Sequence, residues 1–186
     1  MSKEFVEAKI FLVKVIPENI EQYLYVKKKA SLFSKAYEEM QGVWLAMETE
    51  LRQSAFKEGL RMLIYDKKTN VLYGYVEAEI DNDNSAGINI GVLEEYRNRG
   101  IATKAAKDFV NYVFEIQDID FITWNAFLNN KASCRVAEKI GGIKKKSGST
   151  VLEAMENVGF STDKLKANEL LQEACYVIFR ENLPKK

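Results

Sequence analysis

Apolar residues along the 186-residue chain follow two kinds of spacing, which divide it into strands and helices. Apolar, β-branched and aromatic runs, several of them alternating with polar residues, predict strands at residues 8–15, 61–65, 71–80, 87–93, 120–127 and 174–179. Apolar positions three and four residues apart predict helices around Ile20, around Trp44, after Gly100 and at Asn130. The expected order is therefore strand, two helices, three strands, helix, strand, helix and final strands.

The stretch from Ser147 to Gln172 is long for a connection between the final strands. We expect it to carry one or two short helices. It either closes over a substrate or is a solvent-exposed excursion, and both interpretations stay open because loops vary freely in length and sequence.

A strand gives way to a helix at residues 97–103, and this junction is the most informative feature of the chain. Upstream, Ile88, Ile90 and Val92 share one face of the expected strand, and downstream apolar residues recur at helical spacing from Ala102 onward. The first N–H groups of a helix have no acceptor within the helix, and the helix dipole adds partial positive charge there. The junction therefore predicts a site for a pyrophosphate.

The junction reads Arg97-x-x-Gly100-x-Ala102, which suits such a site chemically. Gly100 lets backbone approach a ligand with no Cβ in the way, and Ala102 keeps the next position small. Arg97 and Arg99 offer charge-assisted hydrogen bonds. The spacing is neither the dinucleotide-binding Gly-x-Gly-x-x-Gly nor the P-loop with its Gly-Lys-Ser/Thr ending, so nucleotide hydrolysis is not indicated.

A second motif occupies the next expected helix. Asn130-x-x-Ser133 opens that helix and Lys139-x-Gly141-Gly142 ends it. The first motif resembles the Gln/Arg-x-x-Gly-x-Gly/Ala signature of the GNAT superfamily of acetyl-CoA-dependent N-acetyltransferases. The second is similar to the ribosomal-protein-acetyltransferase-like branch of that family, although Gly142 stands where the branch usually has phenylalanine.

This resemblance implies a fold and a co-substrate site. The fold is α/β (α+β), a single GNAT-like domain over residues 1–186 with a mixed, mostly antiparallel central sheet of about six to seven strands. Helices cover both faces of the sheet, and strands 4 and 5 form a splayed parallel pair. Acetyl-CoA is the implied co-substrate, and a backbone N–H on strand 4 also supports the developing oxyanion. The residues implied in binding it are Ile90, Gly91, Val92, Arg97, Asn98, Arg99, Gly100, Ile101, Ala102, Thr103 and Asn130.

The implied reaction is direct transfer of an acetyl group to a primary amine, which requires proton transfers. An alkylammonium of pKa ~10.4 must lose a proton before it attacks, and a thiolate whose thiol has pKa ~8.5 must regain one. Glu77 and Glu79 are candidates for a base that acts through water, because residues two apart share a strand face. Alternating acids are also typical of a solvent-exposed strand face.

The sequence lacks the tyrosine that commonly protonates the thiolate in this family. Many relatives use a tyrosine at the position that is Ala137 here. The branch instead has a serine near the sulfur, which corresponds to Ser133. Asn130 is also a good helix N-cap, and Ser133 lies at the matching position of that cap, so a structural and a chemical role can coexist in both residues.

Composition restricts the remaining possibilities. Lys+Arg and Asp+Glu number 27 each, so no overall charge favours nucleic acid or an anionic membrane as partner. The chain has no histidine, and Cys134 and Cys175 are not spaced as a metal or redox motif, so we expect no metal and two small buried thiols. The sequence lacks a signal-peptide pattern and a membrane-spanning apolar run, which predicts a cytoplasmic protein.

Aromatic and acidic side chains near the expected site do not identify the acceptor. The aromatic residues are core residues by default, although they are also suited to line an acceptor pocket; they are Trp44, Tyr73, Tyr75, Trp124 and Phe127. Asp81 and Asp83, with Glu77 and Glu79, are suited to attract a cationic amine, but a turn of Asp and Asn also forms for backbone reasons alone.

Three hypotheses about function stay open. The leading one is an N-acetyltransferase acting on a primary amine, either a small molecule or, as the branch resemblance favours, a protein N-terminus. The rival is a non-catalytic acyl-CoA-binding or regulatory module. The third is that residues 97–103 form only a tight turn, with Arg97 and Arg99 on a solvated surface. A homodimer is expected only because relatives commonly form one.

Overall fold

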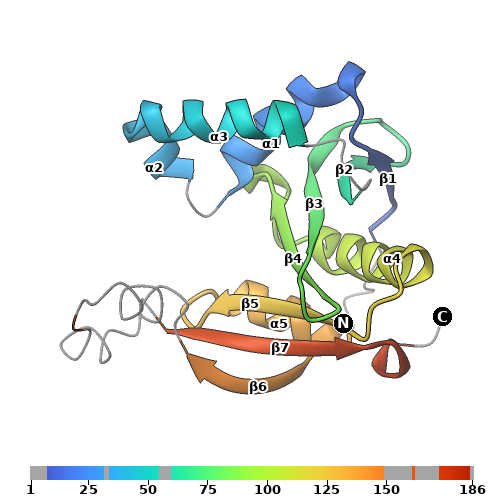
Figure 1. Cartoon of the computed structure of the whole chain (residues 1–186). Helices are drawn as coiled ribbons and strands as arrows, with labels where there is room; N and C mark the ends of the chain where they lie inside the picture. Colours follow the sequence, from blue (N-terminus) through green and yellow to red (C-terminus); the bar gives the residue numbers. More distant parts are fainter. Residues whose placement is uncertain (1–7, 32–33, 55–59, 149–160, 162–171, 185–186) are drawn as a thin grey trace, which may run out of the picture. The chain divides into compact units, whose positions relative to one another are not determined.

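The structure is a computed structural model that describes residues 8–31, 34–54, 60–148, 161 and 172–184. Figure 1 shows its helices and strands. In chain order they are β1 (Ile10–Lys14), α1 (Ile20–Ala30), α2 (Ser34–Glu39), α3 (Gln41–Ser54), β2 (Arg61–Asp66), β3 (Leu72–Ile80), β4 (Ser85–Val92), α4 (Ile101–Ile116), β5 (Phe121–Phe127), α5 (Lys131–Lys139), β6 (Ile143–Gly148) and β7 (Glu173–Phe179). Short 3-10 turns lie at Pro17–Asn19, Glu94–Tyr96 and Arg180–Asn182.

The strands form a seven-stranded mixed sheet in the order β1-β2-β3-β4-β5-β7-β6, which confirms the predicted fold class. β1 pairs antiparallel with β2, as do β2 with β3, β5 with β7 and β6 with β7. β4 and β5 pair in parallel, and their register joins Ser85, Ala86 and Gly87 of β4 to β5. β4 continues to Val92 beyond that register.

The described residues divide into two compact units. The first comprises Met1–Glu79 and Asn89–Ile116, and the second comprises Ile80–Ile88 and Gln117–Lys186. β4 contributes to both units, because its first half belongs to the second unit and its second half to the first.

In the first unit, β2 and β3 are buried on both faces. Met62, Leu63 and Ile64 are consecutive and all buried, and side chains of consecutive strand residues point to opposite faces. Leu63 belongs to a core shared with Tyr23 of α1 and Trp44 of α3, while α4 packs against β1. Helices therefore flank this part of the sheet, as expected.

In the second unit, α5 packs against β5 and β7. Ile122, Trp124 and Ala126 of β5 are buried and alternate with more exposed residues, which is the period-2 pattern predicted from the sequence. Trp124 and Tyr176 are register partners, so their side chains stand on the same face of the sheet.

The elements differ from the sequence expectations in two places. The sequence pattern predicts two helices between β1 and β2, and the structure adds α2, a six-residue helix too short to show an apolar period. β6, whose sequence IKKKSG has little apolar content, is also a strand that the pattern did not locate. The short helices expected within residues 147–172 lie mostly outside the described residues.

No helix in the described ranges is both long enough and apolar enough to cross a membrane.

Candidate functional site

The junction at residues 97–103, called the cradle below, has the geometry expected of an anion site. After the Glu94–Tyr96 turn, Asn98 and Gly100 both adopt left-handed backbone conformations, with φ of 62° and 76°. α4 then begins at Ile101, and Lys104 N–H donates to the Gly100 carbonyl over 3.0 Å. The N–H groups of the three residues before Lys104 precede this first helical bond, so they are the donors that a helix start leaves for a ligand.

Space at the cradle fits the pyrophosphate that acetyl-CoA would bring. A Cβ built on Gly100 meets no atom within 4 Å, so the surface above this backbone is open. The left-handed φ of Gly100 favours glycine for backbone reasons alone. A ligand can therefore reach the main chain here without displacing a side chain.

Both cradle arginines are exposed, and each donates a hydrogen bond to a backbone carbonyl. Arg97 Nε donates to the Val92 carbonyl over 3.0 Å, and an Arg99 nitrogen donates to the Glu95 carbonyl over 2.9 Å. The Arg99 guanidinium also lies 5.6 Å from the Tyr96 ring centroid. Within the described ranges neither arginine forms an ion pair with a carboxylate, so both charges remain available to an anion.

The second half of β4 presents alternate backbone groups to opposite sides. The Gly91 carbonyl lies against Gly74 of β3, and Leu93 N–H donates to the Tyr73 carbonyl over 2.9 Å. Because backbone groups alternate along a strand, those of Ile90 and Val92 face away from β3. Of the three strand residues implied in binding acetyl-CoA, Ile90 and Val92 therefore have backbone groups directed away from β3, where a ligand can pair with them, and Gly91 does not.

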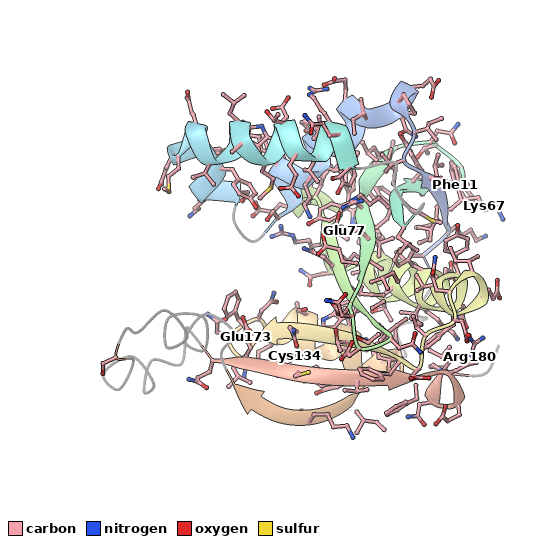
Figure 2. All side chains as sticks on the ribbon, viewed as in Figure 1. Phe11, Lys67, Glu77, Cys134, Glu173 and Arg180 are labelled. Atoms are coloured by element: carbon pink, nitrogen blue, oxygen red, sulfur yellow. The ribbon has the colours of Figure 1, made fainter. Side chains whose placement is uncertain are left out.

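Glu77 lies at the centre of a buried polar group in the first unit. Figure 2 labels this side chain on β3. Tyr23 Oη donates to one of its carboxylate oxygens, and Lys27 Nζ donates to the other. Arg61 Nε lies 3.9 Å from Glu77 and has no hydrogen-bond acceptor within the described ranges. Lys27 Nζ also lies 4.8 Å from the Tyr75 ring centroid. These five residues are called the Glu77 cluster below.

The two candidate bases have different surroundings. Glu77 is 5% exposed, so the solvent-exposed interpretation of the alternating acids is wrong for it. The Glu79 side chain is 76% exposed and lies 3.9 Å from Arg61, so that interpretation holds for Glu79. Burial and then the Glu77 carboxylate raise the pKa of Tyr23 above its ordinary value, which keeps Tyr23 a neutral donor.

In the second unit, Ser133 lies between a helix cap and a tryptophan. Asn130 caps α5, because its side-chain oxygen accepts from Ser133 N–H over 3.1 Å. Trp124 Nε1 donates to Ser133 Oγ over 2.9 Å. A serine hydroxyl has one donor and two acceptor positions, so this bond leaves the Ser133 O–H able to donate.

Tyr176 is a neighbour of α5 that the sequence did not single out. Its hydroxyl donates to Glu138 over 3.1 Å, and burial, followed by Cys134 and Glu138, raises its pKa. Alternation along β7 indicates which face Tyr176 occupies, but no sequence signal showed that α5 covers this face. The position that many relatives fill with tyrosine, Ala137, is fully buried.

Most of the remaining candidate residues are buried or half-buried, as is typical of residues that stabilise the fold. Trp44, Tyr75 and Trp124 are buried core residues, as expected by default, while Tyr73 and Phe127 are half-buried. Cys134 is buried and Cys175 is half-buried; burial raises the pKa of Cys175, which disfavours its thiolate. No group of three or more Cys, Asp and Glu side chains in the described ranges is arranged to hold a metal ion.

The structure brings the predicted site residues together in three sets. The cradle with the end of β4 is one, and Glu77 with Glu79 beside Arg61 is another; both belong to the first unit. Asn130 and Ser133 form the third set, in the second unit.

The sequence matches the family model of the acetyltransferase (GNAT) domain over residues 9–143. This match spans both motifs and most of the chain. The chain therefore belongs to the GNAT acetyltransferase family, as its two motifs indicated. A search of curated proteins by sequence found no match.

Solved structures share this fold at low sequence identity. A GNAT-family acetyltransferase from Bacillus anthracis is 18% identical, with a TM-score of 0.63, and the alignment covers 93% of this chain and 96% of that one. Spermidine N-acetyltransferase from Vibrio cholerae in complex with CoA and spermine is 16% identical, with a TM-score of 0.69 and coverage of 95% and 98%.

Proposed function

We propose that this chain transfers an acetyl group from acetyl-CoA directly to a primary amine. The observation that carries the proposal is the cradle, where an open helix start and two arginines without carboxylate partners lie in a GNAT acetyltransferase domain. Acetyl-CoA would supply the thioester that reacts with the amine. The chain's own residues bind it, orient it and move protons.

Binding is assigned to backbone more than to side chains. The N–H groups of Ile101, Ala102 and Thr103 hold the pyrophosphate, with Asn98 and Gly100 shaping the turn beneath it. Arg97 and Arg99 add charge. The Ile90 backbone and the Val92 N–H, on the side of β4 that faces away from β3, pair with the pantetheine arm, while the Val92 carbonyl accepts from Arg97. Asn130 remains a further candidate contact.

Glu79 is the better of the two candidate bases on accessibility. Its carboxylate is largely exposed, whereas both oxygens of Glu77 already accept hydrogen bonds within the Glu77 cluster. Water can therefore carry a proton to Glu79 without breaking a buried ion pair. In this assignment Glu77 positions α1 against β3.

Ser133 is the candidate donor to the thiolate. The Ser133 oxygen accepts a hydrogen bond from Trp124 Nε1. The hydroxyl hydrogen therefore points away from Trp124 and can be donated to another group. Loss of this donor in Ser133→Ala is expected to lower kcat more than it raises KM.

The first experiment titrates acetyl-CoA into the purified chain by calorimetry. We expect saturable binding that Arg97→Ala and Gly100→Val both weaken, since the valine fills the open space and disfavours a positive φ. Lys14→Gln, an exposed lysine at the far end of β1, is the charge control. Absence of binding by the folded protein would contradict the proposal.

The second experiment measures acceptor-dependent release of CoA. The panel includes peptides with free N-termini, spermidine and simple primary amines, because a protein N-terminus and a small-molecule amine are the two acceptor classes considered. Release that depends on one class identifies it. Binding of acetyl-CoA without release by any acceptor would favour the non-catalytic acyl-CoA-binding module.

A homodimer and a cytoplasmic location stay predictions, as does the assignment of residues 1–186 to a single domain.

A further inference from the structure

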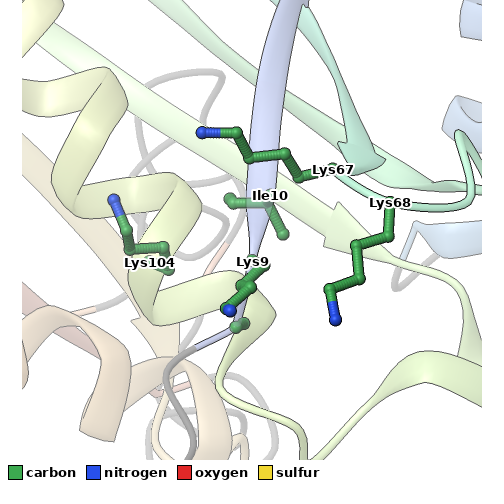
Figure 3. Close-up of a pocket in the computed structure, with 6 residues that line it drawn as sticks. Lys9, Ile10, Lys67, Lys68 and Lys104 are labelled. Carbon is green, nitrogen blue, oxygen red and sulfur yellow. The ribbon is translucent and has the colours of Figure 1, made fainter.

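Four lysines line one pocket in the first unit. The pocket has a volume of about 540 Å³ and is lined by Lys9, Lys67, Lys68 and Lys104 together with Ala8 and Ile10. Figure 3 shows the four lysine side chains around Ile10. It is called the lysine pocket below. The chain as a whole has no net charge, so this is a local concentration of positive charge.

Segments distant in sequence build the lysine pocket. Ile10 at the start of β1 pairs with Asp66 at the end of β2, and Lys67 N–H donates to the Lys9 carbonyl over 2.9 Å. These bonds fix the β2–β3 turn beside the start of β1. Lys104 comes from the first turn of α4, which packs against β1. The backbone therefore holds four positively charged side chains near one another.

Carboxylates of the described residues balance only part of this charge. Lys104 pairs with Asp108 over 2.5 Å. Asp66 stays charged in the adjoining turn, where its oxygens accept N–H bonds from Lys68 and Thr69 and a hydroxyl bond from Tyr73 rather than a bond from a lysine ammonium.

Lys9, Lys67 and Lys68 form no ion pair with any carboxylate of the described residues. Like charges held close together repel one another, and a bound anion relieves that repulsion.

The lysine pocket adjoins the cradle. The end of β2, the start of β3 and the end of β4 meet at one end of the sheet, since Leu93 N–H bonds to the Tyr73 carbonyl and the rings of Tyr73 and Tyr96 lie 4.6 Å apart. Lys104 lies only ~4.5 Å along the helix axis from the helix start at Ile101, at 1.5 Å per residue. An anion in the pocket is therefore a near neighbour of one in the cradle.

We propose that the lysine pocket binds a phosphate group. Ammonium groups are point donors that suit a phosphate dianion approached from several directions. That phosphate has two possible sources: the 3′-phosphate of CoA, which rests on the proposed function, or a separate phosphate-bearing molecule, which does not. Both require the same lysines.

The test compares three ligands and three proteins. CoA and 3′-dephospho-CoA are titrated into wild type, a Lys9→Gln/Lys68→Gln double variant and Lys14→Gln. Inorganic phosphate is titrated in parallel, with the thermal midpoint as readout. Lys14 lies at the opposite end of β1 and is exposed, so it controls for the loss of surface charge. The double variant changes only exposed side chains and is expected to fold.

If the 3′-phosphate is the source, wild type prefers CoA to 3′-dephospho-CoA by about tenfold or more, and the double variant loses this preference. If the source is separate, both CoA forms bind alike, and inorganic phosphate stabilises wild type and Lys14→Gln but not the double variant.

A double variant that matches wild type in every titration overturns the lysine pocket as a phosphate site. Failure of both CoA forms to bind would overturn the proposed function instead, and the phosphate titration would still decide the pocket.

Discussion

Charged side chains are buried and paired within the protein in the Glu77 cluster, whereas the exposed ones around the cradle lack such partners among the described residues. In the cluster, Lys27 and Glu77 are both buried, and each meets its partner inside the protein. At the cradle and the lysine pocket, Arg97, Lys9 and Lys68 are exposed, and they form no ion pair with a carboxylate of the described residues.

The difference separates charges used for folding from charges available for binding. A buried ion pair is costly to break, because its remaining partner stays uncompensated in a low-dielectric interior. An exposed charge costs little to leave without a protein partner, since water solvates it until an anion arrives. Substitutions in the two regions should therefore change different measurements.

The largest expected effect is on stability at the Glu77 cluster. Glu77→Gln leaves the Lys27 ammonium buried without its counter-charge and should lower the free energy of unfolding by ~3–5 kcal/mol. Urea denaturation measures it. Glu79→Gln, on an exposed side chain two residues away, should stay within ~0.5 kcal/mol of wild type. Adding Lys27→Met to Glu77→Gln should recover much of the loss; equal losses at Glu77 and Glu79 would contradict the comparison.

Arg97→Ala should produce the next largest effect, on binding rather than folding. Loss of a charge-assisted hydrogen bond to pyrophosphate is expected to weaken acetyl-CoA binding by ~1.5–3 kcal/mol, roughly ten- to hundredfold. Calorimetry measures it. Arg52 is the matched control because this exposed arginine already pairs with Glu21 and Glu48. Arg52→Ala should leave affinity unchanged; a similar loss in both variants would indicate a nonspecific charge effect.

Ser133→Ala tests a residue with both a structural and a chemical assignment. Removal of its oxygen leaves the buried Trp124 N–H without that acceptor and should lower the free energy of unfolding by ~1–2 kcal/mol. Thermal or urea unfolding measures this, and acetyl transfer is measured on the same sample. A stable variant with wild-type kcat would remove both assignments.

The smallest effect concerns pH and the turn beside the lysine pocket. The Tyr73 hydroxyl, followed by the backbone N–H groups of Thr69 and Lys68, holds the pKa of Asp66 well below its ordinary value. A carboxylate with a lowered folded pKa contributes stability above its unfolded pKa and loses it as pH falls through the folded value.

The stability of wild type should therefore fall toward that of Asp66→Asn between about pH 5 and pH 2. Urea midpoints across that range measure the change, and a constant difference would contradict it.

Local patterns were sufficient to predict the cradle but not its surroundings. Arg97, Gly100 and Ala102 lie within one strand-to-helix junction, so chain order alone indicates their geometry. The Asn130 cap was readable for the same reason. The mixed sheet with its parallel pair followed from the family resemblance that these motifs carry.

Features that depend on distant segments were not readable from the sequence. Glu77 and Glu79 share a pattern of alternation, yet α1 supplies Tyr23 and Lys27 to Glu77 alone. The lysine pocket joins residues from β1, a turn and α4, and none of the three segments is unusual by itself. When a helix from a distant part of the chain buries one residue of a strand, the pattern of that strand's own sequence does not reveal it.

The contact between Gly74 and Gly91 sets a limit on how this protein can be engineered. A Cβ on Gly74 would overlap the Gly91 carbonyl, and a Cβ on Gly91 would meet Tyr75 and Ala30. The obstacle to a side chain at Gly74 is main chain, which no compensating substitution can remove. Any variant library aimed at a new acceptor should therefore hold these two glycines constant and diversify the residues around them.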